Sequence, residues 1–129
     1  MGFAGDDTVL SCGRTLRARQ YAAALAWQDQ APRLLRDGAA RHGSVLVRGM
    51  GRSYGDCGLN PDGALLLAAP LDHLIAFDPA TRRLRAEAGV TIAALLRVLL
   101  PRGFFLPVVP GTSLVSLGGE VANDVHGKN

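Results

Sequence analysis

A glycine-rich segment near the middle of the chain has the composition of an anion-binding loop. The apolar run Val-Leu-Val at 45–47 leads into Arg48, and glycines then occupy positions 49, 51, 55 and 58. Because glycine adopts positive φ at little cost, this density lets successive backbone N–H groups point into one concavity. The commonest biological anion of that shape is a diphosphate. The segment therefore predicts a phosphate loop, with an ordinary surface turn as the alternative.

The spacing of these glycines separates the loop from the Rossmann type. The order Gly-x-Gly-x-x-x-Gly misses the dinucleotide fingerprint by one residue, and the turn-rich residues 57–63 that follow do not open a helix. We therefore expect a phosphate loop that belongs to another fold.

A second segment, at 107–129, combines a rigid loop with a short helix. Two prolines and a glycine restrict residues 107–111, and Ser116 is the predicted N-cap of a helix that runs to about Val125. The first-turn N–H groups of a helix lack intrahelical partners and lie at the positive end of its dipole. Glycines at 118–119 would leave that turn open to a large ligand, so we expect it to contact phosphate.

Together the two segments resemble the FAD-binding domain of the vanillyl-alcohol oxidase (PCMH-type) flavoprotein superfamily. Members carry an Arg-Gly-x-Gly-His/Arg-Ser loop, followed by a segment with Pro-Gly-Thr, Gly-Gly and His-Gly. Residues 48–56 and 124–129 are also similar to the motifs Arg-Gly-x-Gly-Arg-Ser-Tyr-Gly-Asp and Asp-x-His-Gly-Lys-Asn of the decaprenylphosphoryl-β-D-ribose oxidase family. The resemblance covers residues 11–129.

This resemblance implies a set of site residues. The implied FAD contacts are Val47, Arg48, Gly49, Met50, Gly51, Arg52, Ser53, Tyr54, Gly55, Asp56, Cys57, Gly111, Thr112, Ser116, Leu117, Gly118, Gly119, Asn123, Asp124, Val125 and His126. The implied catalytic residues are His126, Tyr54 and Lys128. For His126 and Tyr54, simple packing roles are the alternative.

The resemblance also implies how the flavin is held. Many relatives have a histidine directly after the second loop glycine, where its ring nitrogen bonds covalently to the flavin. Arg52 occupies that position here and cannot form the bond. We therefore expect FAD to be bound non-covalently, with Arg52 donating to phosphate or pairing locally.

Composition excludes several other classes of protein. The net charge of +3 comes from scattered arginines with no interleaved aromatic residues, which argues against a nucleic-acid partner. Cys12 and Cys57 have no histidine at ligand spacing, so we expect no metal site and a reducing compartment. No window approaches 18 apolar residues, so we expect no membrane span. The predicted location is cytoplasmic, with peripheral association at a membrane as the alternative.

The order of elements predicts an α/β (α+β) fold, with small sheets flanked by helices. We expect strands at 8–12, 45–47, 65–68, 74–77 and 84–88, with a hairpin turn at 78–81, an extended segment at 104–109, and helices at 27–40 and 90–100. In the first of these helices, Leu34 and Leu35 are expected to point inward. The resemblance implies that 1–129 is a C-terminally incomplete PCMH-type domain without its substrate domain.

The function implied by the resemblance is the N-terminal part of an FAD-dependent oxidoreductase. Its substrate would be a hydroxyl of a sugar or sugar-like alcohol, a lipid-linked pentose included, oxidised to a carbonyl. A separate reductase or electron acceptor would be a partner, and these 129 residues alone would be inactive. The alternatives are an aldonolactone or sugar-alcohol oxidase and a non-catalytic nucleotide-binding module.

Overall fold

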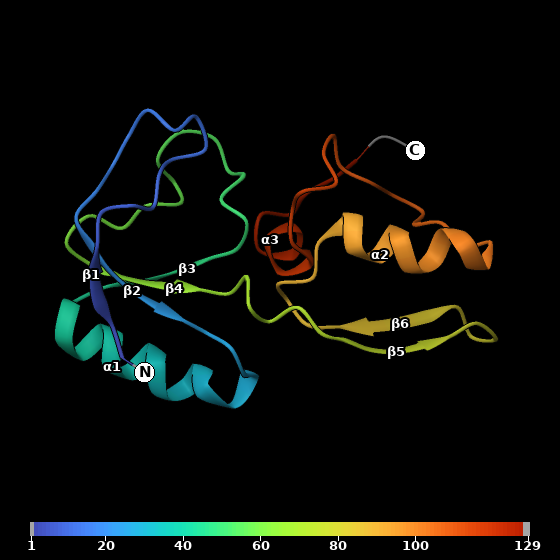
Figure 1. The fold of residues 1–129 in the computed structure, drawn as a ribbon, viewed down its shortest axis with the longest axis horizontal. Helices are drawn as coiled ribbons and strands as arrows, with labels where there is room; N and C mark the ends of the chain where they lie inside the picture. Colours follow the sequence, from blue (N-terminus) through green and yellow to red (C-terminus); the bar gives the residue numbers. More distant parts are fainter. Residues whose placement is uncertain (1, 128–129) are drawn as a thin grey trace.

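A four-stranded mixed sheet forms one half of the molecule in the computed structural model, which describes residues 2–127 (Figure 1). Its strands, in spatial order, are β1 (Ala4–Asp6), β2 (Gln20–Ala24), β4 (Ala64–Leu67) and β3 (Val45–Arg48). The pairs β2–β4 and β4–β3 are parallel, and β1 is antiparallel to β2. The carboxyl ends of the three parallel strands therefore lie at one edge, where the glycine-rich loop begins.

The central strand β4 is buried on both faces, which explains its uninterrupted apolar sequence Ala-Leu-Leu-Leu. Helix α1 (Ala31–His42) covers one face, and its buried Leu34 joins Ala23 and Leu66 in the core. The helix approaches closely because Gly38 has no side chain. A Cβ at this position would lie 2.9 Å from Val45.

The opposite face of the sheet is covered by loops rather than by a helix. The loop before β2 and the loop between β3 and β4 lie together over this face, and Figure 1 shows them in blue and green above the sheet. Ser11 and Leu59, one from each loop, are buried. The two loops therefore close the core on the side where the phosphate loop was predicted.

A hairpin and a helix form the other half (Figure 1). Strands β5 (Leu74–Asp78) and β6 (Arg83–Ala86) pair in antiparallel register. Helix α2 (Ile92–Leu99) starts at Thr91, whose hydroxyl accepts a hydrogen bond from the Ala94 N–H at 3.2 Å. The buried residues of this core are Val90, Ile92, Leu95 and Leu99, and Phe77, Leu84 and Phe104 pack against them.

Three short helices complete the fold. The 3-10 turns η1 (Gln28–Gln30) and η2 (Leu100–Arg102) adjoin α1 and α2, and α3 (Leu117–Ala122) follows the second motif. None of the helices within residues 2–127 has the length and apolarity that a bilayer span requires.

Most of the expected elements are confirmed, and the observed fold is the mixed helix and strand architecture that was predicted. The strands near 45–47 and 65–68, the hairpin with its turn, and the helix after Thr91 are all present. The helix expected at 27–40 is present as η1 followed by α1, because Pro32 fits the first turn of α1.

Four features of the structure differ from the expectations. The first strand is β1 rather than 8–12, where the structure has a loop with a single bridge between Leu10 and Arg17. Strand β2 was not expected, because its polar first residue and alanines give no apolar run. Leu35 is 40% exposed rather than inward. Helix α3 ends at Ala122 rather than near Val125.

Candidate functional site

The two glycine-rich segments meet in the structure. A Cβ placed on Gly49 would overlap the hydroxyl oxygen of Ser116, which is 2% exposed. Gly49 follows β3 and Ser116 caps α3, so this contact joins the two halves of the molecule. The sequence motifs, although far apart in the chain, therefore form one continuous surface.

The glycine-rich loop presents a series of free backbone donors. The N–H groups of residues 50–58 donate to no other residue that the structure describes. Gly51 and Gly55 have φ of 63° and 67°, a conformation that glycine adopts without strain. An array of N–H groups without partners in a loop is the arrangement that binds an anion.

Two arginines bring positive charge to this loop. The Arg48 guanidinium donates to the carbonyls of Gly58 at 2.6 Å and Leu10 at 2.8 Å. Burial lowers the pKa of Arg48, and the neighbouring charge of Arg52 lowers it further. Arg52 is exposed and donates to the carbonyl of Met50 at 3.3 Å.

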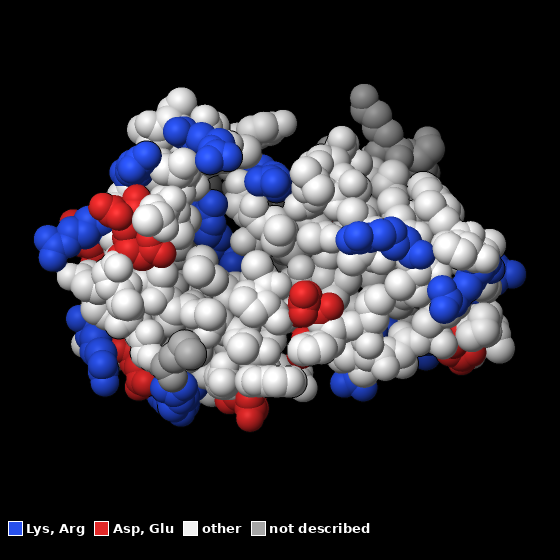
Figure 2. All heavy atoms as spheres, in the orientation of Figure 1, with Lys and Arg blue, Asp and Glu red and all other residues white. Residues whose placement is uncertain are grey.

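Among residues 2–127, neither Arg48 nor Arg52 forms an ion pair. The ion pairs among the described residues are Arg33 with Asp37 and His73 with Glu87, and neither lies in the loop. Figure 2 shows basic atoms over the loops that cover the four-stranded sheet, around a hollow in that half of the molecule, with a group of acidic atoms at its outer side. The loop therefore carries positive charge as well as free donors.

The first turn of α3 differs from the expectation. The Leu117 N–H donates to Val90 O at 2.8 Å, and the Gly118 N–H donates to Ala88 O at 2.8 Å. The Gly119 N–H donates to the Ser116 hydroxyl at 3.3 Å. The prediction that these N–H groups are free for phosphate is wrong, because residues 116–118 run beside 88–91 and use their carbonyls.

The glycines of the second segment have different surroundings. A Cβ on Gly118 would lie 2.8 Å from the Cβ of Ala88, so this glycine allows two chain segments to touch. A Cβ on Gly111 would meet nothing within 4 Å. The Thr112 hydroxyl accepts from the Leu114 N–H at 3.2 Å, which closes a local turn. Of these two glycines, Gly111 alone borders open space.

The implied catalytic residues lie on exposed chain. Tyr54 is 90% exposed, and His126 is also exposed, so neither is packed in a core of the described residues. Asn123 fixes the end of α3 by donating from its side chain to Gly119 O at 2.7 Å. Lys128 lies outside the described residues.

The remaining implied contacts are all near the two loops. Val47 is 52% exposed, and the Asp56 carbonyl accepts from the Leu59 N–H at 2.8 Å. Ser53 is half-buried, while Cys57, Asp124 and Val125 are exposed, the last at 41%. The assignment of these side chains to FAD stays a prediction.

Two features of this region gave no signal in the sequence. Leu10 and Cys12 contact the glycine-rich loop, the latter by donating from Sγ to Arg52 O at 3.7 Å. Glu120, in α3, has a buried carboxylate oxygen without a hydrogen-bond partner among residues 2–127, and burial raises the pKa of this carboxyl. A contact between distant loops follows from the tertiary fold, so no local spacing could predict either feature.

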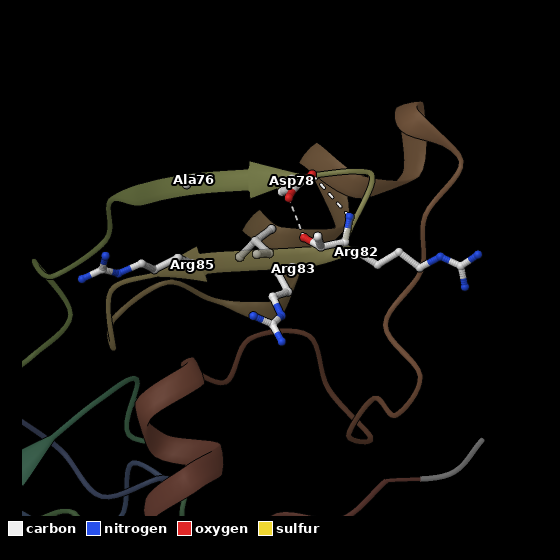
Figure 3. Close-up of a pocket in the computed structure, with 7 residues that line it drawn as sticks. Ala76, Asp78, Arg82, Arg83 and Arg85 are labelled. Carbon is white, nitrogen blue, oxygen red and sulfur yellow. Dashed lines mark hydrogen bonds between the residues drawn. The ribbon is translucent and has the colours of Figure 1, made fainter.

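Two concavities lie away from the glycine-rich loop. One of about 680 Å³ lies on the hairpin, where Figure 3 shows Arg82, Arg83 and Arg85 extending in three different directions. Asp78 is occupied by hydrogen bonds from Thr81. Because ligand sites need convergent polar groups, this surface is a weak candidate.

A second concavity, of about 520 Å³, lies between η1 and the hairpin. Two of its polar side chains are already engaged, because His73 Nδ1 lies 2.6 Å from a Glu87 carboxylate oxygen and the His73 ring stacks on Trp27. Within residues 2–127, no three histidine, cysteine or acidic side chains come together as metal ligands.

Comparison with known proteins shows which family this chain resembles. A family model described as FAD binding domain matches residues 20–129. Decaprenylphosphoryl-beta-D-ribose oxidase of Mycolicibacterium smegmatis is 41% identical over 85 residues, which make up 66% of this chain and 18% of that protein.

Solved structures share the fold. Cholesterol oxidase from B. sterolicum superposes with a TM-score of 0.79 at 16% identity, over 97% of this chain and 25% of that one. Aclacinomycin oxidoreductase gives a TM-score of 0.69 at 22% identity, over 86% of this chain and 23% of that one. The chain thus spans about a quarter or less of the length of these relatives. Since the family model covers most of the sequence, the chain belongs to the FAD binding domain family and has the PCMH-type fold of flavoprotein oxidases.

Proposed function

We propose that the glycine-rich loop binds the diphosphate of FAD within an FAD-dependent oxidoreductase. The observation that carries this proposal is the run of N–H groups at 50–58, which have no partner among residues 2–127, beside Arg52, which forms no ion pair within those residues. These donors fit a diphosphate, which offers several acceptor oxygens and negative charge. The first turn of α3 is assigned no phosphate contact, because its own chain uses its donors.

The second segment would lie beside the rest of the cofactor. A Cβ on Gly111 would meet only open space, and residues 123–126 follow α3 on exposed chain. When bound, FAD supplies the hydride acceptor for oxidation of a hydroxyl to a carbonyl. The protein's part is to hold the cofactor and substrate in reacting geometry and to exclude water.

The proposed substrate is a hydroxyl of a sugar or sugar-like alcohol. The support is the 41% identity to an enzyme whose name specifies a lipid-linked ribose. His126 is proposed to hydrogen-bond the substrate hydroxyl or to help take its proton, a role suited to an imidazole. Tyr54 would border the substrate, and Lys128 would hold an anionic group on it.

An aldonolactone or other sugar-alcohol oxidase is the second candidate. It has the same flavin chemistry, so only the substrate distinguishes the two. We propose a separate electron acceptor or reductase as the partner, and a cytoplasmic location with peripheral association at a membrane as the alternative. A panel of sugar alcohols, aldonolactones and a prenyl-phosphoryl pentose, assayed with the flavin-loaded protein and a dye acceptor, separates the substrates.

A flavin titration tests the binding proposal. Because charge-assisted hydrogen bonds to a diphosphate contribute about 1.5–3 kcal/mol, Arg52→Met is expected to raise the Kd for FAD by about tenfold or more. Arg36→Met is the matched control, since Arg36 is an exposed arginine on α1, away from the loop. ADP should compete with FAD, and FMN should bind more weakly.

Equal FAD affinity in the two variants would remove Arg52 from the site. A parent chain that binds neither FAD nor ADP would contradict the whole proposal and favour a module without nucleotide binding.

A further inference from the structure

Arg48 lies at the point where three segments of the chain meet. We propose that it is a positioning residue: its guanidinium fastens the loop at 10–17 to the glycine-rich loop, and thereby sets the curvature of the free N–H groups without touching the cofactor. The inference rests on the proposed function, because it explains how the phosphate loop is held in shape.

Both ends of the guanidinium are engaged by backbone. Nη1 donates to Gly58 O at 2.6 Å, and Nη2 donates to Leu10 O at 2.8 Å. The planar fork of an arginine can hold two carbonyls in fixed relative positions, which the single ammonium of a lysine does less well. One side chain therefore connects the end of β3 to the far end of its own loop and to a separate loop.

Two glycines of the loop leave the space that the Arg48 side chain occupies. A Cβ on Gly58 would lie 2.6 Å from Arg48 Nη1, and a Cβ on Gly51 would overlap Nη2. Gly51 also has positive φ, whereas Gly58 does not. At position 58 it is the packing of Arg48, rather than the backbone conformation, that requires a glycine.

The N-terminal loop is itself ordered enough to act as an anchor. The Ser11 N–H donates to Leu16 O at 3.1 Å, the Leu16 N–H donates to the Ser11 hydroxyl at 3.1 Å, and Ser11 is 4% exposed. Cys12 makes a second contact with the glycine-rich loop at Arg52 O. This anchor precedes residue 20, where the match to the family model begins.

Arg48 and Arg52 therefore have separate roles. Arg52 is exposed and makes one contact within its own loop, at 3.3 Å, so it can turn toward a ligand. Arg48 is half-buried and already carries two short hydrogen bonds. Breaking these bonds to reach a phosphate would leave two carbonyls without their donor.

Amide hydrogen exchange on the 129-residue chain without flavin tests the anchoring directly. In Arg48→Met, exchange should accelerate in both 10–17 and 49–58, while the hairpin and α2 keep the parental rates. Arg48→Lys should restore part of the protection. If only the loop at 49–58 changes, or neither loop does, the proposed connection is refuted.

Flavin affinity distinguishes a positioning residue from a phosphate ligand. Arg48→Met is expected to raise the Kd for FAD by about tenfold, on the scale of one charged hydrogen bond. The dependence of that Kd on salt should stay parental, whereas Arg52→Met should make it shallower. A shallower salt dependence in Arg48→Met would identify a direct phosphate contact and overturn the proposal.

Gly58→Ala provides an independent test if Arg48→Met does not fold. The added methyl group should accelerate exchange in both loops by displacing the guanidinium. In the Arg48→Met background the same change should have little further effect, because the side chain it displaces is gone. If the effects of Gly58→Ala and Arg48→Met on exchange were additive, the proposed contact between Gly58 and the Arg48 side chain would be refuted. A parent that binds no FAD would defeat the proposed function, while the exchange result would still decide the role of Arg48.

Discussion

Replacing Gly49 with alanine probes the contact that joins the two motifs. The new Cβ would overlap the Ser116 hydroxyl, and Ser116 is 2% exposed, so its side chain has little room to move. Gly49 does not have positive φ, so backbone strain does not contribute. The cost comes from overpacking and from weakening the N-cap bond between Ser116 and the Gly119 N–H.

The two contributions can be estimated separately. Overpacking a well-filled site costs about 1–3 kcal/mol. Loss of a serine N-cap costs about 1 kcal/mol, of which α3 would lose part. A total of about 2–3 kcal/mol corresponds to a fall in Tm of roughly 10 °C for a domain of this size. Thermal unfolding of the flavin-free chain, followed by circular dichroism, measures this fall.

A double-mutant cycle identifies the neighbour responsible. Ser116→Ala removes the oxygen that the new Cβ would meet, so Gly49→Ala should cost less in that background, with a coupling of about 1–2 kcal/mol. Gly5→Ala is the control, because a Cβ there meets nothing within 4 Å and its φ is not positive. Unchanged Tm in Gly49→Ala, or the same cost with and without the serine oxygen, would refute the predicted contact.

Three further outcomes are expected. FAD bound to the protein should be released intact by acid precipitation, because Arg52 cannot form the covalent bond of histidine; flavin absorbance in the washed pellet would contradict this. Gly118→Ala should destabilise the chain by about 1–3 kcal/mol through overlap with Ala88, with no specific loss of FAD affinity beyond that of the folded fraction. Burial raises the pKa of the Glu120 carboxyl in the folded state. The protonated carboxyl therefore favours folding fully below the ordinary pKa of 4.5, and this contribution is lost as the pH rises through the raised pKa. Glu120→Gln should therefore raise Tm near pH 7 but not near pH 4, and equal shifts at both pH values would contradict that cause.

Elements with strong local signals could be predicted from the sequence. The N-caps Thr91 and Ser116 accept the hydrogen bonds that their positions indicate. The turn at 78–81 has an aspartate whose carboxylate accepts from two following N–H groups, and it joins β5 to β6 as expected. Each of these structures depends on residues within a few positions of one another, which is why a single sequence suffices.

Features that depend on tertiary pairing could not be predicted. Strand β2 is held in place by β4 on one side and β1 on the other, and its alanines fit there because the sheet is closely covered. The N–H groups of α3 are used by the carbonyls of Ala88 and Val90, a pairing that only the folded chain brings about. The sequence therefore predicted that the first-turn N–H groups of α3 were free to bind phosphate, although the folded chain uses them.

Tertiary contacts also determine what each glycine of the two motifs does. A glycine in a nucleotide-binding motif can make room for the ligand, or it can make room for another part of the protein. Gly49, Gly58 and Gly118 belong to the second kind, because an added Cβ meets Ser116, Arg48 and Ala88. At Gly111 an added Cβ meets only open space. Substitutions of the first three should therefore lower the stability of the flavin-free chain, whereas Gly111→Leu should leave Tm unchanged and weaken FAD binding. If Gly111→Leu binds FAD as the parent does, the cofactor does not pass over this loop.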